Sequence, residues 1–299
     1  MSVHSTALLG QIVHGDRLAV LSSLPSESVD LTVTSPPYNC GKDYGATSDA
    51  LPWGEYWTQT EAWLGQVFRV TRPGCRLAVN LPWWMNKKPR RDVPFQFKTV
   101  AQAVGWTMLD KIIWIKGDSN NVHTSGGWGG GGCGWGTYLS PSGPSIRCAS
   151  EPILIFSKGG RGRRVLSGEG RGLCVRGDMT KAEWMAWTLD VWFVRGASCK
   201  EHPAVFPVEI PRRLIKLYTY PGDVVLDPHN GAGATTEAAS ETGRQYIGID
   251  ANEEFCRVAR RRVSSPNQFR QGRGGAAYPE RAGWRSGFIS RKTTKGERK

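Results

Sequence analysis

Hydrophobic positions along the chain alternate between short β-branched runs and longer segments with helical spacing. Residues 28–34 have the pattern of a buried strand, and this strand ends at two prolines, which cannot donate to a β-ladder. Residues 54–70 place apolar side chains at i, i+3, i+4 and i+7, the spacing of an amphipathic helix. The same reasoning predicts strands at 76–81, 106–116 and 151–158 and helices at 97–104 and 207–220.

A β-α-β pattern near the C-terminal end is the clearest unit. It consists of a strand at 223–227, a glycine turn, a helix at 235–241, a strand at 245–250 and a helix at 253–263. Strands that alternate with helices favour a mostly parallel, twisted sheet with helices on both faces. We therefore expect an α/β fold of the Rossmann type.

Two segments interrupt this rhythm. Residues 117–147 are rich in glycine, serine and proline and are expected to form a mobile loop. Residues 264–299 carry nine basic side chains against two acidic ones and lack apolar periodicity, so a flexible basic tail is expected there. A turn is expected at Pro73-Gly74.

Composition narrows the function. The 299 residues carry a net charge of +13, and no apolar run approaches the ~18 residues that a membrane helix needs. A strongly basic chain without a membrane segment points to a polyanion, most often nucleic acid. The seven cysteines are scattered and the five histidines lack ligand spacing, which favours a cytoplasmic protein with no metal site.

The turn after the strand at 223–227 has the chemistry of a nucleoside site. Glycines let the backbone approach a ligand, and Asp250, at the end of the next strand, can accept hydrogen bonds from ribose hydroxyls. The pyrophosphate fingerprint is incomplete, and Asp227 would repel a pyrophosphate but suit a cationic amino group such as that of S-adenosylmethionine. A turn without a ligand is the alternative. The candidate residues here are Asp227, Asn230, Gly231, Gly233, Thr235 and Asp250.

The first predicted strand ends in Ser35-Pro36-Pro37-Tyr38. Prolines have no N–H and a fixed φ, so their carbonyls are rigid acceptors, and the serine hydroxyl supplies another. Such acceptors suit an exocyclic amine, because holding both of its hydrogens localises the nitrogen lone pair toward an electrophilic methyl group. The Tyr38 ring offers a face on which a base could stack. Taken alone, this motif is also compatible with a simple proline-rich turn.

Several blocks together resemble the amino-methyltransferases of DNA. Four stretches carry the resemblance. They are 15–39 with its Ser-Pro-Pro-Tyr-Asn segment, Arg-Val-Thr-Arg-Pro-Gly at 69–74, His-Pro-Ala-Val-Phe-Pro at 202–207 and Pro-Gly-Asp-Val-Val-Leu-Asp-Pro at 221–228. The catalytic motif precedes the cofactor motif, as in the permuted β group of that family. Serine at position 35 is similar to the cytosine-N4 branch. The resemblance covers roughly residues 11–263.

The resemblance implies a role for individual residues. Ser35 and the Pro36 carbonyl would bind the target amine, and Tyr38 would stack on an extruded base. S-adenosyl-L-methionine would be held by the glycine turn and by Asp250 at its ribose, with Phe206 in the cofactor pocket and Asp16 near the adenine. His229 departs from the family, which usually has phenylalanine after Asp-Pro, and Ala234 stands where threonine is common.

We expect the chain to be organised into four parts. Residues 1–158 would form the catalytic half, 159–200 the target-recognition region, 201–263 the cofactor half and 264–299 the tail. Double-stranded DNA is the expected partner, and a cognate restriction endonuclease and a homodimer are compatible with this class of enzyme. Expected DNA contacts are Arg161, Arg163, Arg164, Arg171, Lys87 and Lys88. The alternatives are a solvated basic loop for the arginines and a plain surface charge run for the lysines.

Three other readings remain open at this point. Adenine-N6 methylation would use the same fold, and a non-catalytic DNA-binding protein could keep it. A nicotinamide-dependent dehydrogenase is disfavoured by the missing third glycine of its fingerprint. Ring-carbon methylation is disfavoured because none of the seven cysteines follows a proline.

Overall fold

The computed structural model describes residues 8–45, 48–83, 91–118, 121–122, 139–144, 148–160, 177–197, 201–203 and 206–265, and the single residues 137, 146 and 162. In these ranges nine strands form a mixed sheet of order β1-β9-β8-β2-β3-β6-β4-β5, with β7 paired to β4. The strands are β1 (Gln11–His14), β2 (Val29–Thr34), β3 (Thr71–Asn80), β4 (Thr107–Asp118), β5 (Asn121–Val122), β6 (Ser150–Ser157), β7 (Val191–Val194), β8 (Val224–Asp227) and β9 (Gln245–Asp250). The helices are α2 (Arg17–Ser23), α3 (Trp53–Val70), α4 (Val93–Val104), α5 (Lys181–Trp187), α6 (Glu209–Tyr218), α7 (Ala234–Glu241) and α8 (Glu253–Ser264).

Five neighbouring strands, from β1 through β9, β8 and β2 to β3, run parallel. β6 is antiparallel to both β3 and β4. From β8 the chain continues to β9 on one side, whereas from β2 it continues to β3 on the other, so the strand order reverses between β8 and β2. In open α/β sheets, ligands bind beyond the carboxyl ends of the strands at such a reversal.

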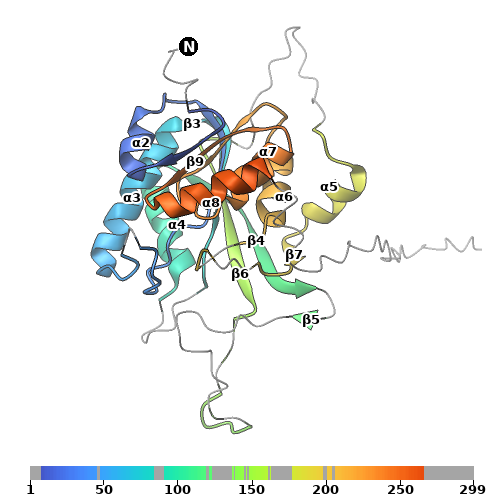
Figure 1. Ribbon diagram of the computed structural model, residues 1–299. Coiled ribbons are helices and arrows are strands. Elements are labelled where there is room, and N and C mark those ends of the chain that lie inside the picture. The colour runs from blue at the N-terminus through green and yellow to red at the C-terminus, as the bar shows by residue number, and fades with distance from the viewer. Residues whose placement is uncertain are drawn as a thin grey trace, which may run out of the picture.

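Helices cover both faces of the sheet, as Figure 1 shows. On one face α2, α3 and α4 bury Leu21, Trp63 and Phe97 against the strands. On the other face α6 and α7 bury residues such as Leu214 against Leu31 of β2. The central strands are therefore covered on both sides, which explains why β2 is buried along its whole length. No helix in the described ranges is long and apolar enough to cross a membrane.

The predicted α/β fold is confirmed, and each strand and helix expected from the pattern is present with shifted ends. The turn predicted at Pro73-Gly74 is wrong. β3 runs through Pro73 and Gly74, and the pairing of β2 with β3 shifts register there. The two residues therefore form an irregularity within the strand. The elements that were not predicted are β1, α2, β5, α5 and β7.

The predicted loop 117–147 and the expected target-recognition region 159–200 both contain regular structure. β4 extends to Asp118, and Asn121–Val122 pairs with it, so the segment 117–147 begins as a hairpin. Within residues 159–200, α5 packs against α6 and β7 adds a parallel strand beside β4. Most of the glycine-rich stretch and the tail from residue 266 onward lie outside the described residues.

Side chains as well as backbone join β2 to β8. The Thr34 hydroxyl donates to Asp227 Oδ1 at 2.8 Å, and the two residues are 193 positions apart in the chain. The backbone N–H of His229 donates to the same oxygen at 3.0 Å. Asp227 is 1% exposed, and its burial raises the pKa of the carboxyl to about 7.

Replacing Leu31 with alanine should leave a cavity in the centre of the sheet, because this side chain is 0% exposed. We expect the free energy of unfolding to fall by about 2–5 kcal/mol in urea titrations. Phe95→Ala is the matched control, since Phe95 is 64% exposed and its loss should change the value by less than about 0.5 kcal/mol. Equal losses in both variants would contradict the packing described above.

Asp227 should make the stability depend on pH. Its pKa is about 7 in the folded protein against a usual value of 3.8, so the folded state binds more protons than the unfolded state between these values. The contribution of Asp227 to the free energy of unfolding should therefore fall as the pH rises from about 4 to about 7, by roughly 4 kcal/mol. Unfolding titrations of the wild type and of Asp227→Asn across this range isolate the contribution. A constant difference between the two proteins would contradict it.

Candidate active site

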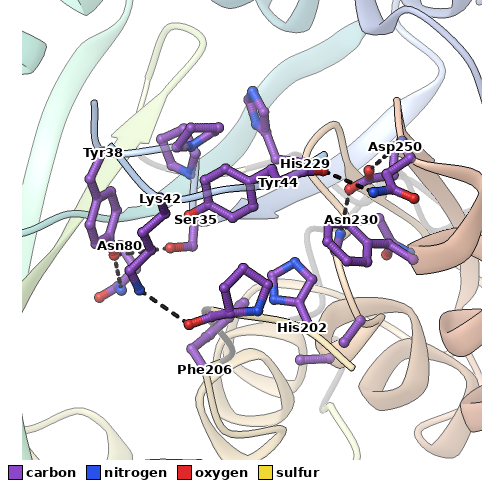
Figure 2. Close-up of a pocket in the computed structure, with 18 of the residues that line it drawn as sticks. Ser35, Tyr38, Lys42, Tyr44, Asn80, His202, Phe206, His229, Asn230 and Asp250 are labelled. Atoms are coloured by element: carbon purple, nitrogen blue, oxygen red, sulfur yellow. Dashed lines mark hydrogen bonds between the residues drawn. The ribbon is translucent and has the colours of Figure 1, made fainter. Parts of the chain in front are cut away.

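A cavity of about 320 Å³ lies at the carboxyl ends of β2, β8 and β9, where the strand order reverses. This volume lies in the range of pockets that bind small molecules. In Figure 2, Tyr38 and Asn80 lie at one end of the cavity and Asn230 and Asp250 at the other. The predicted site residues that line it are Asp16, Ser35, Pro36, Pro37, Tyr38, Phe206, Asn230, Gly231 and Asp250.

The remaining predicted residues lie elsewhere. Asp227, Gly233 and Thr235 do not line the cavity but belong to the structure that supports its wall. Asp227 binds Thr34 and the turn, as described above, so the sequence-based expectation of a direct contact with a ligand amino group has no support in the cavity lining. The expected DNA contacts Arg161, Arg163, Arg164, Arg171, Lys87 and Lys88 lie outside the described residues.

The Ser-Pro-Pro-Tyr segment forms the first end of the cavity. The hydroxyls of Ser35 and Tyr38 are 3.0 Å apart, and Tyr38 is 6% exposed. The Pro37 carbonyl accepts from Tyr56 Oη at 2.9 Å, whereas no donor in the described part of the chain reaches the Pro36 carbonyl. Ser35 Oγ and the Pro36 carbonyl therefore remain as acceptors for a ligand at this end.

Three polar residues that the sequence analysis missed complete this end. Asn80 Nδ2 donates to Tyr38 Oη at 2.8 Å and to Glu151 Oε2 at 2.7 Å. Lys116 Nζ is 2.5 Å from Glu151 Oε1, so the buried carboxylate has a cationic partner. Burial, followed by the nearby Glu151 charge, raises the pKa of Tyr38 well above its usual value and keeps the phenol protonated. In the sequence, only their places near strand ends could have pointed to these residues.

The glycine turn and Asp250 form the second end. Asp250 Oδ2 accepts from the Gly231 N–H at 2.8 Å and Oδ1 accepts from the Asn252 N–H at 2.9 Å. Each oxygen keeps a lone pair for a ligand hydroxyl. Burial is the main cause that raises the pKa of Asp250.

Close packing explains both glycines of this turn. Gly231 has a φ of +48°, and a Cβ there would lie 2.8 Å from His202 Nε2. Gly233 has a φ of +84°, and its Cβ would lie 2.7 Å from the Cβ of Ala259 on α8. Any side chain would therefore strain the backbone and collide with a neighbour. These glycines hold the turn against His202 and α8 and leave the Gly231 N–H free to bind Asp250.

A segment after Tyr38 crosses the cavity between its two ends. Lys42 Nζ donates to the Pro203 carbonyl at 3.3 Å, and the Tyr44 carbonyl accepts from Asn252 Nδ2 at 2.8 Å. The Tyr44 ring lies 5.9 Å from the ring of His202. Figure 2 shows Lys42, Tyr44, His202 and Phe206 between the two ends. Of these four, the sequence analysis had singled out Phe206 and, as part of a motif, His202.

Asp16 and Arg17 begin α2 at the rim. The Asp16 carboxylate caps the helix by accepting from the Ala19 N–H at 2.9 Å, and the Gly15 N–H donates to the Asp250 carbonyl at 3.0 Å. These bonds place Asp16 beside the second end. Arg17 also lines the cavity and was not predicted; its burial lowers the pKa of the guanidinium.

His229 occupies the place where phenylalanine was the expected residue. Its ring packs edge-on against Trp63 at 5.0 Å, and its Nδ1 lies 3.1 Å from the Thr34 hydroxyl. Burial lowers the pKa of His229 well below its usual value, so the ring is neutral. A neutral imidazole fills this aromatic position and adds a hydrogen bond to β2.

The cavity thus has two ends with different chemistry. The first offers Ser35 Oγ and the Pro36 carbonyl as neutral acceptors, which suit an amine that carries two hydrogens, beside the Glu151–Lys116 ion pair. The second offers a carboxylate, backbone groups and aromatic side chains, which suit a nucleoside with free ribose hydroxyls. Among the described residues, no group of three or more His, Cys, Asp or Glu side chains could hold a metal ion.

Comparison with known proteins agrees with this arrangement. A family model described as DNA methylase, for N6 and N4 methyltransferases, matches residues 29–261. The type II methyltransferase M.MjaVI of Methanocaldococcus jannaschii is 32% identical over 190 residues, which cover 64% of this chain and 88% of that protein. The DNA adenine methyltransferase YhdJ of Escherichia coli K12 is 26% identical, and the match covers 86% of this chain and 84% of that protein.

A solved structure supports the fold independently. A protein of Thermus thermophilus, described as a DNA modification methylase and complexed with S-adenosyl-L-methionine, has a TM-score of 0.65 and 25% identity. The match covers 85% of this chain and 93% of that chain. Since the family model spans most of the sequence, the chain belongs to the N6/N4 methyltransferase family of DNA methylases.

Proposed function

We propose that this protein transfers a methyl group from S-adenosyl-L-methionine to the exocyclic N4 amine of cytosine in double-stranded DNA. The observation that carries the proposal is that Ser35 and Pro36 line the same cavity as Gly231 and Asp250. Acceptors for an amine and a site for a nucleoside cofactor therefore open into one space. Direct transfer between two bound molecules needs such an arrangement.

The second end of the cavity fits the cofactor. The Asp250 carboxylate would accept from the ribose hydroxyls, Asp16 and Phe206 would border the nucleoside, and the turn at Asn230–Gly231 would contact the methionine part. When bound there, S-adenosyl-L-methionine supplies an electrophilic sulfonium methyl group. The residues of the chain bind and orient; Asp227, Gly233 and Thr235 support the turn from behind the cavity wall.

The first end of the cavity fits the target amine. Ser35 Oγ and the Pro36 carbonyl would accept its two hydrogens and direct the nitrogen lone pair toward the methyl group. A base stacked in a duplex cannot reach this end, so it has to be flipped out at a cost of a few kcal/mol. The Tyr38 ring, whose hydroxyl is fixed by Asn80, would offset part of this cost by contact with the base.

The choice of cytosine rests on the serine at position 35, which is similar to the cytosine-N4 branch of the family. Adenine-N6 transfer is the second candidate, because the E. coli relative is a DNA adenine methyltransferase. Both bases present an amine beside a ring nitrogen, so the same acceptors could hold either. Mass analysis of nucleosides from methylated DNA distinguishes the two products; N6-methyladenine without N4-methylcytosine would overturn the cytosine assignment.

Contacts to the DNA are proposed for the basic segments of the chain. The net charge of +13 favours binding to phosphates, and Arg161, Arg163, Arg164, Arg171, Lys87 and Lys88 are the candidates. Target recognition is proposed for residues 159–200, of which α5 and β7 attach to the sheet while the arginine-rich part provides the base contacts. A cognate restriction endonuclease and a homodimer remain proposals of the same kind.

Ser35→Ala should lower methyl transfer by about 100-fold or more, because one acceptor for the amine is lost in a preorganised site. Cofactor affinity should stay within about twofold, since Ser35 lies at the other end of the cavity. Tritiated methyl incorporation and calorimetry measure the two quantities. Ser28→Ala is the control, because Ser28 bonds the Pro25 carbonyl at the start of β2. Wild-type turnover in Ser35→Ala would reject the site assignment.

Asp250→Ala should weaken cofactor binding by about 10- to 100-fold, the loss expected when two hydroxyls lose a charged acceptor. Calorimetry with S-adenosyl-L-methionine gives the dissociation constant. Glu253→Gln is the matched control, since its side chain is 55% exposed and pairs with His14 and Arg260 outside the cavity. An unchanged constant in Asp250→Ala would show that the ribose is bound elsewhere.

A further inference from the structure

A buried ion pair lies directly behind the amine end of the cavity. Glu151 on β6 is 3% exposed, and Lys116 on β4 neutralises it at 2.5 Å. Replacing such a pair with apolar residues is often neutral for stability, so folding alone gives little reason for it here. Both side chains line the cavity, and neither belongs to the motifs identified in the sequence.

The carboxylate fixes the orientation of Asn80. An ionised carboxylate only accepts hydrogen bonds, so the Asn80 amide must turn its nitrogen toward Glu151 Oε2. The second hydrogen of the same nitrogen then points at Tyr38 Oη, 2.8 Å away. Tyr38 Oη therefore already accepts one hydrogen bond. The state of Ser35 then depends on where the hydrogen of the Tyr38 hydroxyl points.

Tyr38 has two acceptors for that hydrogen. Ser35 Oγ is 3.0 Å away, and Glu151 Oε2 is 3.4 Å away. A hydrogen bond to a charged acceptor is roughly twice as strong as one to a neutral acceptor, which favours the carboxylate despite the longer distance. With the phenol hydrogen directed at Glu151, the Ser35 hydroxyl can donate to Tyr38 Oη.

This direction leaves the lone pairs of Ser35 Oγ for the target amine. In the opposite direction, Tyr38 would donate to Ser35 and occupy one of those lone pairs. The serine hydrogen would then be free to point at the amine nitrogen and engage the lone pair that has to attack the methyl group. The hydrogen bond between Tyr38 and Ser35 would thus assist the transfer when Ser35 is the donor and hinder it when Tyr38 is the donor.

We propose that Glu151, paired with Lys116, is a positioning residue that directs the hydrogen bonds of Tyr38 and Ser35 so that Ser35 accepts from the target amine. This inference rests on the proposed transfer to an exocyclic amine and applies to cytosine and adenine alike. Within the described chain, the titratable groups that contact Glu151 are Lys116 from β4 and Tyr38 from the segment after β2; from β3 it is contacted by the uncharged Asn80.

The pH profile of Lys116→Met tests the proposal. Without its cation, the buried carboxylate should be protonated more readily than in the wild type, since burial disfavours the charged form. Single-turnover methyl transfer by this variant should be about 10- to 100-fold below wild type at about pH 6.5 and recover toward the wild-type rate by about pH 9. Glu151→Gln should be reduced by a similar factor at every pH, because its amide cannot be ionised.

Asp30→Asn is the matched control. Asp30 is 1% exposed and pairs with Arg72, as Glu151 pairs with Lys116, but it does not line the cavity. This variant should show the wild-type rate and pH profile per folded molecule, even where its stability falls. Cofactor affinity, measured by calorimetry, should be unchanged in all three variants.

Two results would overturn the positioning role. One is a Lys116→Met rate that stays parallel to the wild-type rate across the pH range. The other is wild-type turnover in Glu151→Gln. The second result still tests the proposal if Lys116→Met does not fold. The wild-type rate measured in the same assay separates this failure from failure of the proposed function. If the wild-type protein methylates no DNA, the function is wrong, whereas active wild type with unresponsive variants rejects only the role of Glu151.

Discussion

The pairing of β2 with β8 is the constraint on which the site depends. Leu31 and Thr32 are in register with Val225 and Leu226, and the Thr34 hydroxyl binds Asp227 at the ends of the two strands. These contacts join segments almost 200 residues apart in the chain and make the Ser-Pro-Pro-Tyr segment a neighbour of the glycine turn. Without this pairing, the amine acceptors and the nucleoside site would be two unrelated surface features. The reversal of strand order at the same point opens the space between them.

The electrostatics of the cavity follow from burial. Tyr38 and His229 are both neutral, and burial favours this state because it raises the pKa of the phenol and lowers the pKa of the imidazole. The two buried carboxylates of the cavity both have partners: Glu151 pairs with Lys116, and Asp250 accepts from two backbone N–H groups. The charges that line the amine end, Glu151 and Lys116, pair with each other. The same low polarity makes the direction of each hydrogen bond matter.

The sequence predicted the parts of the site that depend on local pattern. Strand β2 and the β8-turn-α7-β9 unit could be located from their hydrophobic runs. The two prolines and the glycine turn follow the ends of strands, and this position indicated that they bind a ligand. Asn80, Lys116 and Glu151 could not be found in this way, because they meet only through the antiparallel insertion of β6 between β3 and β4. The glycines were assigned to close approach of a ligand, whereas contacts with His202 and Ala259 also require them. Short elements such as β7, with four residues, carry too little periodicity to be recognised.

A crystal structure of the protein with sinefungin, an unreactive analogue of the cofactor, and a cognate DNA duplex tests the central claim most directly. The account predicts a flipped base whose exocyclic nitrogen lies within about 3 Å of Ser35 Oγ and faces the analogue, with the ribose of the analogue bound to Asp250. A target base bound away from Ser35, or an analogue seated outside the turn at Gly231, would contradict it.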